Sequence, residues 1–285
     1  EGYRGPVPQA LSGFTGLDEF LGGFQPSDLV IIAGRTSMGK TSLALSIARN
    51  AAVEQGACVA LFSLEMAQEP LVLRLLANES GVNSRRVRLG FHLNEEEEKR
   101  IMEATGILSE APIYIDDSPQ IRVVEMRSKA RRLHYERGIN LIIVDYLQLV
   151  QGEDRRENRV QEIGYISRSL KALARDLNVP VIALSQLSRQ VDWRASHIPK
   201  LSDLRESGSI EQDADIVMFI HREEADYPTI EEWQNQFPDR EYPREIADII
   251  IAKHRNGPTG QMKLRFRHNL AKFENLTNIE EPSLL

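Results

Sequence analysis

The chain has 285 residues, 41% of them hydrophobic and 27% charged, which is the composition of an ordinary globular protein long enough for one large domain. Its single cysteine, Cys58, excludes a disulfide framework and a cysteine-rich metal site. A net charge of −7 excludes a protein coated in phosphate-binding charge, so any nucleic-acid contact would come from local basic clusters. No apolar run has the length of a membrane span, and we expect a cytoplasmic protein without a membrane partner.

Apolar runs of strand length alternate with longer amphipathic stretches along the chain. Two-sided apolar runs of this kind predict an α/β fold with a mostly parallel, twisted sheet covered by helices. The runs are residues 28–34, 57–63, 111–117, 140–146, 179–186, 214–220 and 247–253.

Helix and turn signals fill in the remaining elements. Asn94 and Glu97 predict a capping box at the start of one helix, and Gly138 predicts the end of another. Residues 260–268 and 270–276 alternate in strand fashion and predict an antiparallel hairpin at the sheet's edge. Residues 222–245, with three prolines and many acids, predict an excursion between two strands.

The segment "GRTSMGKT" fits the P-loop (Walker A) pattern in full, directly after one apolar run and at the start of a helical pattern. Its glycines let backbone N–H groups surround a phosphate, Lys40 reaches the β/γ oxygens, and Thr41 offers a hydroxyl to Mg²⁺. The alternative is a plain glycine-rich turn. We expect ATP and Mg²⁺ as ligands, with the nucleotide surrounded by Gly34, Ser37, Met38, Gly39, Lys40, Thr41 and Ser42.

Asp145 ends the apolar run 140–146 and suits the Walker B position, where a carboxylate supports Mg²⁺. The next residue is Tyr146 and not a glutamate, so we expect the base that activates water to come from another strand. Glu65 follows the run after the P-loop helix, and a strand neighbouring the P-loop strand would bring it within one water of the γ-phosphate. A glutamate that merely starts a helix is the alternative.

Gln186 ends a further predicted strand, where its amide could sense the γ-phosphate; a plain polar strand end is the alternative. The run 247–253 delivers Lys253 and Arg255 to a tight turn. A turn after such a late strand should project from the subunit edge, so we expect both cations to meet a neighbouring subunit's ATP, with Arg255 making the two-pronged contact. An edge hairpin with solvated cations is the alternative.

Seven segments, in order, resemble the RecA-like motor domain of the DnaB-type replicative hexameric helicases of bacteria. They are residues 13–24, 34–45, 61–66, 142–149, 183–189, 201–222 and 253–260. The resemblance implies an ATP-dependent DNA helicase with 5′ to 3′ polarity that works as a hexameric ring at the replication fork. It also implies catalytic roles for Lys40, Glu65, Asp145, Gln186, Lys253 and Arg255, with Thr41 and Asp145 at the metal. For Arg74 it suggests nucleotide binding, and a surface or packing role is equally open.

The segment "LRESG" matches the family's DNA-loop motif, so we expect Arg205, Glu206 and Gly208 to contact single-stranded DNA. Arg156 and Arg159, after the run 140–146, and Arg194, after the run 179–186, join these DNA candidates, with a solvated surface as the alternative. Aromatic residues are scarce in these segments, which favours contact with backbone phosphates and sequence-independent binding.

We expect residues 1–285 to form one motor domain, with residues 1–12 as a linker remnant and residues 276–285 as a flexible tail. The excursion at 222–245 is longer than the family leads us to expect. The family's helical N-terminal domain and linker helix are not in this sequence, so we expect primase docking to be lost, whereas the full-length protein would meet a helicase loader and primase. The competing function is a RecA- or KaiC-like, ATP-gated assembly without processive unwinding; "DYLQL" and "LRESGSIEQDAD" favour the helicase.

Overall fold

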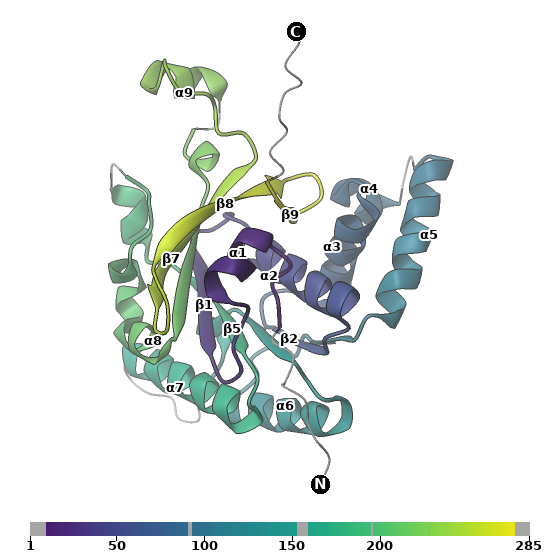
Figure 1. Ribbon diagram of the computed structural model, residues 1–285, viewed down its shortest axis with the longest axis vertical. Coiled ribbons are helices and arrows are strands. Elements are labelled where there is room, and N and C mark those ends of the chain that lie inside the picture. Colours follow the sequence, from purple (N-terminus) through teal and green to yellow (C-terminus); the bar gives the residue numbers. More distant parts are fainter. Residues whose placement is uncertain (1–9, 91–92, 153–158, 195, 228, 277–285) are drawn as a thin grey trace.

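The structure is a computed structural model, and it describes residues 10–90, 93–152, 159–194, 196–227 and 229–276. The strands within these residues form one sheet in the order β3-β2-β4-β5-β1-β6-β7-β8-β9 (Figure 1). Their bounds are β1 Leu29–Gly34, β2 Val59–Ser63, β3 Ile113–Asp116, β4 Leu141–Asp145, β5 Val181–Gln186, β6 Ile216–His221, β7 Ile246–His254, β8 Gly260–Arg267 and β9 Lys272–Asn275.

Helices cover both faces of this sheet (Figure 1). Their bounds are α1 Thr15–Leu21, α2 Lys40–Arg49, α3 Gln68–Ser80, α4 Ser84–Leu89, α5 Glu95–Glu110, α6 Val123–Arg137, α7 Arg159–Leu177, α8 Gly208–Asp213 and α9 Ile230–Gln236. Shorter helical turns are η1 Asn50–Glu54, η2 Leu147–Leu149, η3 Arg189–Trp193, η4 Leu201–Ser207 and η5 Glu223–Ala225. None of the described helices has both the length and the apolar character that a membrane span requires.

The seven strands predicted from apolar runs are all present, and the predicted mostly parallel α/β fold is confirmed. β3, β2, β4, β5, β1 and β6 run parallel, and β7 to β9 form an antiparallel edge. Successive residues of a strand point to opposite faces. In β1, Val30 and Ile32 therefore pack with α1 and α2, whereas Leu29 and Ile31 pack with α6 and α7.

The predicted caps and hairpin are also confirmed. The Asn94 side chain accepts from the Glu97 N–H at 2.8 Å, and the Glu97 carboxylate accepts from the Asn94 N–H at 3.0 Å. Gly138 ends α6 with φ +70°, a left-handed conformation that favours glycine. β8 and β9 pair as the expected antiparallel hairpin, from Leu264 opposite Asn275 to Arg267 opposite Lys272.

The two ends of the chain are described only in part. Residues 1–9 and 277–285 lie outside the described residues, so the linker remnant and the tail stay predictions. The described part begins at Ala10, which is buried and forms an isolated bridge with Phe24. Ser12 is fully buried as well, so the chain joins the domain at this point.

The excursion lies between β6 and β7 and builds a small core of its own. Trp233 of α9 is fully buried and contacts the rings of Tyr227, Phe237 and Tyr242. The indole Nε1 donates to the carbonyl of Arg240 at 3.1 Å. Figure 1 shows α9 standing apart at the top of the view, at the end of a loop that rises from the sheet.

A buried ion pair fastens the base of the excursion to the β8–β9 hairpin. Arg222, 4% exposed, pairs with Glu224, lies 4.4 Å over the Phe266 ring, and donates to the Ser37 carbonyl of the P-loop. His268 also contacts the Glu224 carboxylate, at 2.7 Å. Burial alone would raise the pKa of Glu224, but bonds from His268, from a backbone N–H and from Arg222 lower it to about 2.

This ion pair should make the domain's stability depend on pH below about 5. Since the folded pKa of Glu224 lies below its ordinary value of 4.5, its contribution is full above that value and is lost as pH falls toward 2. Glu224→Gln should lower the free energy of unfolding by roughly 2–3 kcal/mol at pH 7, and the deficit should shrink between pH 5 and pH 3. Urea unfolding across this range measures both effects.

The neighbouring Glu223 provides a matched control. Its pair with Arg240 is at the surface, so Glu223→Gln should change the free energy of unfolding by less than about 1 kcal/mol at any of these pH values. A deficit for Glu224→Gln that stays constant from pH 7 to pH 3 would contradict the assignment of the pH dependence to this carboxylate.

Candidate active site

The loop between β1 and α2 has the backbone that a phosphate-binding loop needs. It joins Gly34, at the carboxyl end of a buried strand, to Lys40, at the amino end of a helix. Gly39 has φ +98°, where any other residue would be strained, and a Cβ there would come within 3.1 Å of the Phe273 ring. The first N–H groups of an α-helix have no partner within the helix, so those at the start of α2 suit a bound anion.

Thr41 and Asp145 lie together beside the loop. Thr41 Oγ1 donates to Asp145 Oδ2 at 2.8 Å. Asp145 is 2% exposed, and burial raises its pKa, while the bond from Thr41 counteracts that shift. The described residues contain no group of three His, Cys, Asp or Glu that could hold a metal ion by itself. The pair fits Mg²⁺, which takes few protein oxygens and completes its shell with water and phosphate.

Lys40 reaches back across the loop from the first turn of α2. Its Nζ donates to the carbonyls of Gly34, at 2.9 Å, and of Arg35, at 3.0 Å. Burial lowers the pKa of Lys40, and the charges of Asp145 and Glu65 oppose that change. The ammonium thus lies in the hollow of the loop, where P-loop proteins bind β- and γ-phosphate oxygens.

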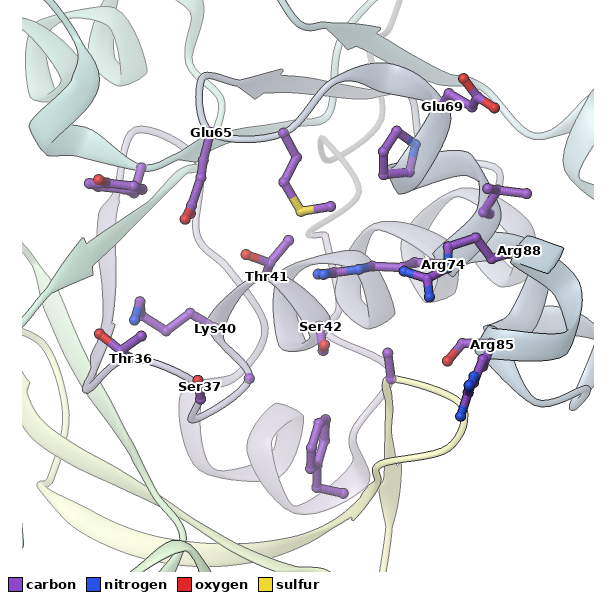
Figure 2. A pocket seen from close by; sticks show the side chains of 18 of the residues that line it. Thr36, Ser37, Lys40, Thr41, Ser42, Glu65, Glu69, Arg74, Arg85 and Arg88 are labelled. Carbon is purple, nitrogen blue, oxygen red and sulfur yellow. The ribbon is translucent and has the colours of Figure 1, made fainter.

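The loop opens into a pocket of about 920 Å³ (Figure 2). Pockets of several hundred Å³ are typical of small-molecule sites. Met38 is 3% exposed and packs into the core, and Gly34 forms the base of the loop. The other residues predicted around the nucleotide or at the reacting phosphate that line this pocket are Ser37, Gly39, Lys40, Thr41, Ser42, Glu65, Arg74 and Gln186.

Glu65 reaches the pocket by a route that the sequence did not predict. The expectation that its strand neighbours the P-loop strand is wrong, because β4 and β5 lie between β2 and β1. Ser63 at the end of β2 is instead paired with Asp145. The turn after β2 then carries Glu65 to the pocket wall, and Figure 2 shows its side chain pointing into the pocket on the side of Lys40.

Gln186 lies directly beside the P-loop. β5 pairs with β1 so that Gln186 is opposite Gly34. The Gln186 amide donates to Thr36 Oγ1 at 3.0 Å, which joins the end of β5 to the loop itself. A ligand that moves the loop would therefore move Gln186 and the segment after it.

Arginines from two helices line the far side of the pocket. Arg74 comes from α3, as the sequence suggested, and Arg85 and Arg88 come from α4 (Figure 2). The sequence pattern alone did not indicate Arg85 or Arg88 as pocket residues. The segment "SRRVRL" indicates a basic helix, but it does not show which of its arginines face the P-loop. The packing of α4 against α3 brings Arg85 and Arg88 to the pocket.

The cations of the β7 turn are Lys253, near the end of β7, and Arg255, in the turn that follows β7. They lie at the opposite end of the strands from the P-loop. Ile216, at the start of β6, pairs both with Val30 near the start of β1 and with His254 at the end of β7. Lys253 and Arg255 are therefore at the amino end of β1, whereas the P-loop follows its carboxyl end. The six residues of β1 separate the two by roughly 20 Å.

The predicted DNA contacts are only partly described. Arg156 lies outside the described residues, and so do the side chains of Arg205 and Glu206, whose backbone belongs to η4. Gly208 begins α8. Two candidates make internal ion pairs, Arg159 with Glu162 and Arg194 with Asp203, both at 2.6 Å.

Comparison with known proteins agrees with this geometry. The family model of the DnaB-like helicase C terminal domain matches residues 10–275. The chain belongs to this family. The resemblance inferred from the seven segments is thereby confirmed.

Relatives and solved structures support the same assignment. The replicative DNA helicase DnaB of Geobacillus stearothermophilus is 50% identical over 95% of this chain, and the replicative DNA helicase DnaC of Bacillus subtilis (strain 168) is 50% identical over 96%. This DnaB-like chain spans 58% of the length of each. One solved structure, titled as an ATPase domain, has a TM-score of 0.86 at 37% identity, covering 96% of this chain and 94% of its own.

Proposed function

We propose that this chain is the motor domain of a replicative DNA helicase, in which ATP hydrolysis between ring subunits drives translocation on single-stranded DNA and unwinds duplex. One observation carries the proposal. The pocket is lined by a P-loop, a lysine and a glutamate, which suit nucleotide binding and water activation, but the cations that would complete the site lie a strand's length away in the same subunit. A complete site therefore needs two subunits.

Within this proposed site each side chain has a distinct task. The N–H groups at the start of α2 and the Lys40 ammonium bind the β- and γ-phosphates. Thr41 and Asp145 would hold Mg²⁺, which would neutralise charge on phosphate oxygens. Glu65 accepts the proton of the attacking water, and Gln186 contacts the γ-phosphate from beside Thr36.

The cation pair of the β7 turn acts on the neighbouring subunit in this proposal. Arg255 contacts the transferring phosphoryl group with its planar guanidinium, and Lys253 lies beside it as a point charge. Arg74 binds nucleotide from within the subunit, since it lines the same pocket as Lys40.

The DNA would pass along the loops that follow the strands. Arg205, Glu206 and Gly208 contact the sugar-phosphate backbone, assisted by Arg156, Arg159 and Arg194, with no dependence on base sequence. A ring of six subunits, 5′ to 3′ movement, and a helicase loader and primase as partners of the full-length protein are part of the same proposal. A solved structure, 37% identical with a TM-score of 0.86, is titled as a DnaB-like replicative helicase and its interactions with primase.

Strand displacement from a forked DNA duplex tests the proposal. This chain should release the labelled strand when given ATP and Mg²⁺ but not when given a non-hydrolysable ATP analogue. Ring assembly and DNA-stimulated ATP hydrolysis without release of the strand would instead support an ATP-gated assembly of the RecA or KaiC kind. The mass in solution, with and without ATP and single-stranded DNA, shows which assembly is being measured.

Arg205→Ala tests the DNA contact within the same assays. Single-stranded DNA should stimulate ATP hydrolysis, and the substitution should reduce this stimulation while leaving the DNA-free rate nearly intact. Loss of one phosphate contact should reduce the slope of log affinity against log salt by about 0.7. Arg132→Ala, on the exposed face of α6, is the matched control and should leave the slope unchanged. An unchanged slope in Arg205→Ala would exclude this phosphate contact.

A further inference from the structure

Asp215, the residue just before β6, binds Arg255 in the turn after β7, and Lys253 binds carbonyls of residues that precede Asp215. We propose that Asp215 is a positioning residue that holds Arg255 in the geometry needed to reach a neighbouring subunit's ATP. This inference rests on the proposed role of that cation pair between subunits. It adds a residue that contacts neither nucleotide nor metal in its own subunit.

Arg255 is bound to Asp215 through both its backbone and its side chain. The Arg255 N–H donates to the Asp215 carbonyl at 2.8 Å. Arg255 Nη1 donates to Asp215 Oδ1 at 3.1 Å. The side chain of Arg255 nevertheless remains 51% exposed, so one edge of the guanidinium is fixed while the rest faces outward. A fixed guanidinium loses less freedom when it meets a phosphate.

Lys253 is held by the same segment. Its Nζ donates to the carbonyl of Ala214 at 2.7 Å and to that of Glu211 in α8. Both carbonyls lie at or just beyond the carboxyl end of α8. Carbonyls at this end of a helix carry partial negative charge and attract a cation. Arg255 Nη2 adds a longer contact of 3.4 Å to the Gln212 carbonyl. Both cations are therefore anchored to the short stretch that ends in Asp215.

The Asp215 carboxylate is itself fixed from the opposite side. It is 5% exposed, and its Oδ2 accepts from the Leu29 N–H at 2.8 Å and from the Lys171 ammonium. Oδ1 is the atom left for Arg255. The two carboxylate oxygens thus have separate partners. Oδ2 binds Leu29 of β1 and Lys171 of α7, and Oδ1 binds Arg255 of the β7 turn. This arrangement suits a rigid support for a group that acts elsewhere.

Asp28 offers a comparison at an equivalent position. It precedes β1 as Asp215 precedes β6, and it is 8% exposed. Burial and the nearby charge of Asp215 raise the pKa of Asp28 to about 6. Among the described residues, its carboxylate makes no hydrogen bond to Arg255 or Lys253. Asp28→Asn therefore neutralises a buried carboxylate in the same region without releasing the cation pair.

Kinetics of Asp215→Asn provide the first test. The amide oxygen can still accept from Leu29, but the ion pair with Arg255 is lost. We expect kcat to fall about 10- to 100-fold, as small displacements of catalytic groups do, with ATP affinity unchanged. Asp28→Asn should keep the wild-type kcat. In an Arg255→Ala background, Asp215→Asn should cause no further loss, whereas a further loss would indicate a general structural role and overturn the proposal.

Mixing of subunits separates an effect on the neighbour from an effect on the subunit's own P-loop. Asp215→Asn subunits keep an intact P-loop, and Lys40→Ala subunits keep an intact cation pair. Activity should therefore return when the two are mixed. If it does not return, while a mixture of Arg255→Ala and Lys40→Ala is active, Asp215 acts through Leu29 on its own P-loop strand, and the inference is wrong although the proposed function stands. Wild-type activity of Arg255→Ala alone would remove the proposed role itself.

Circular dichroism and thermal melting establish whether each variant is folded. Should Asp215→Asn not fold, Asp215→Glu replaces it, because it keeps the charge that Lys171 needs and adds one methylene. The longer side chain displaces Arg255, so kcat should again fall and should recover on mixing with Lys40→Ala. An undiminished kcat in Asp215→Glu would overturn the proposal.

Discussion

Subunits carrying Arg255→Ala and subunits carrying Lys40→Ala should hydrolyse ATP when mixed, although each variant should be nearly inactive alone. The reason is the distance between the β7 turn and the P-loop of the same subunit, which lie at opposite ends of β1. A cation that stabilises charge on a transferring phosphoryl group contributes roughly 10³ to 10⁵ in rate, so Arg255→Ala alone should lose about that factor. Steady-state ATP hydrolysis at a series of mixing ratios measures the recovery.

The size of the recovery follows from counting interfaces. In an equal mixture roughly a quarter of the interfaces pair an intact P-loop with an intact cation turn, so activity should approach that share of wild type. Exchange of subunits is monitored separately with labelled protein. Lys263→Ala, an exposed lysine on β8, is the control and should be active without mixing. Absence of recovery despite proven exchange would mean that the cations act within one subunit or that hydrolysis needs every site of the ring.

Glu65→Gln should retain ATP binding and lose most turnover. Glutamine fills the same space but cannot accept a proton from the attacking water, and loss of a general base typically costs roughly 10² to 10⁴ in rate. Lys40→Ala should differ in kind, because it removes the ammonium from the hollow of the loop and should weaken nucleotide binding itself. Binding of a fluorescent ATP analogue and single-turnover hydrolysis separate the two effects.

Glu69 supplies the control for that experiment. It lines the same pocket, four residues further along the chain on the first turn of α3. Glu69→Gln removes an equal charge from the pocket and should keep turnover within a few-fold of wild type. If Glu65→Gln and Glu69→Gln behaved alike, the loss would come from the electrostatic balance of the pocket, and Glu65 would have no special part in activating water.

The strands and the P-loop could be predicted because the residues that determine them lie within the same short segments. A strand buried on both faces must be apolar throughout, as residues 29–34 are, and a loop that surrounds phosphate must place glycine where Gly39 adopts φ +98°. The order of the strands has no such local cause. Nothing in residues 57–63 indicates that two later strands insert between β2 and β1, and the predicted adjacency of Glu65's strand failed for that reason.

Some residues of the candidate site could likewise be predicted from local sequence, and others could not. Lys40, Thr41 and Asp145 could be recognised because residue type and position after a strand define their chemistry. Arg85 and Arg88 could not, because their place in the pocket depends on how α4 packs against α3. The hydrogen bonds that hold Lys253 could not be predicted for another reason. Its partners are backbone carbonyls, which every residue possesses and which no sequence pattern marks.

The antiparallel pairing of β6 with β7 makes the two ends of the subunit unlike. This pairing places the P-loop pocket at one end of the strands and the cations proposed to complete such a pocket at the other. Two subunits that meet end to end in two-fold symmetry would join like ends, pocket to pocket or cation to cation. Only head-to-tail contact joins unlike ends, and contact of that heterologous kind repeats from subunit to subunit until it closes into a ring or continues as a filament.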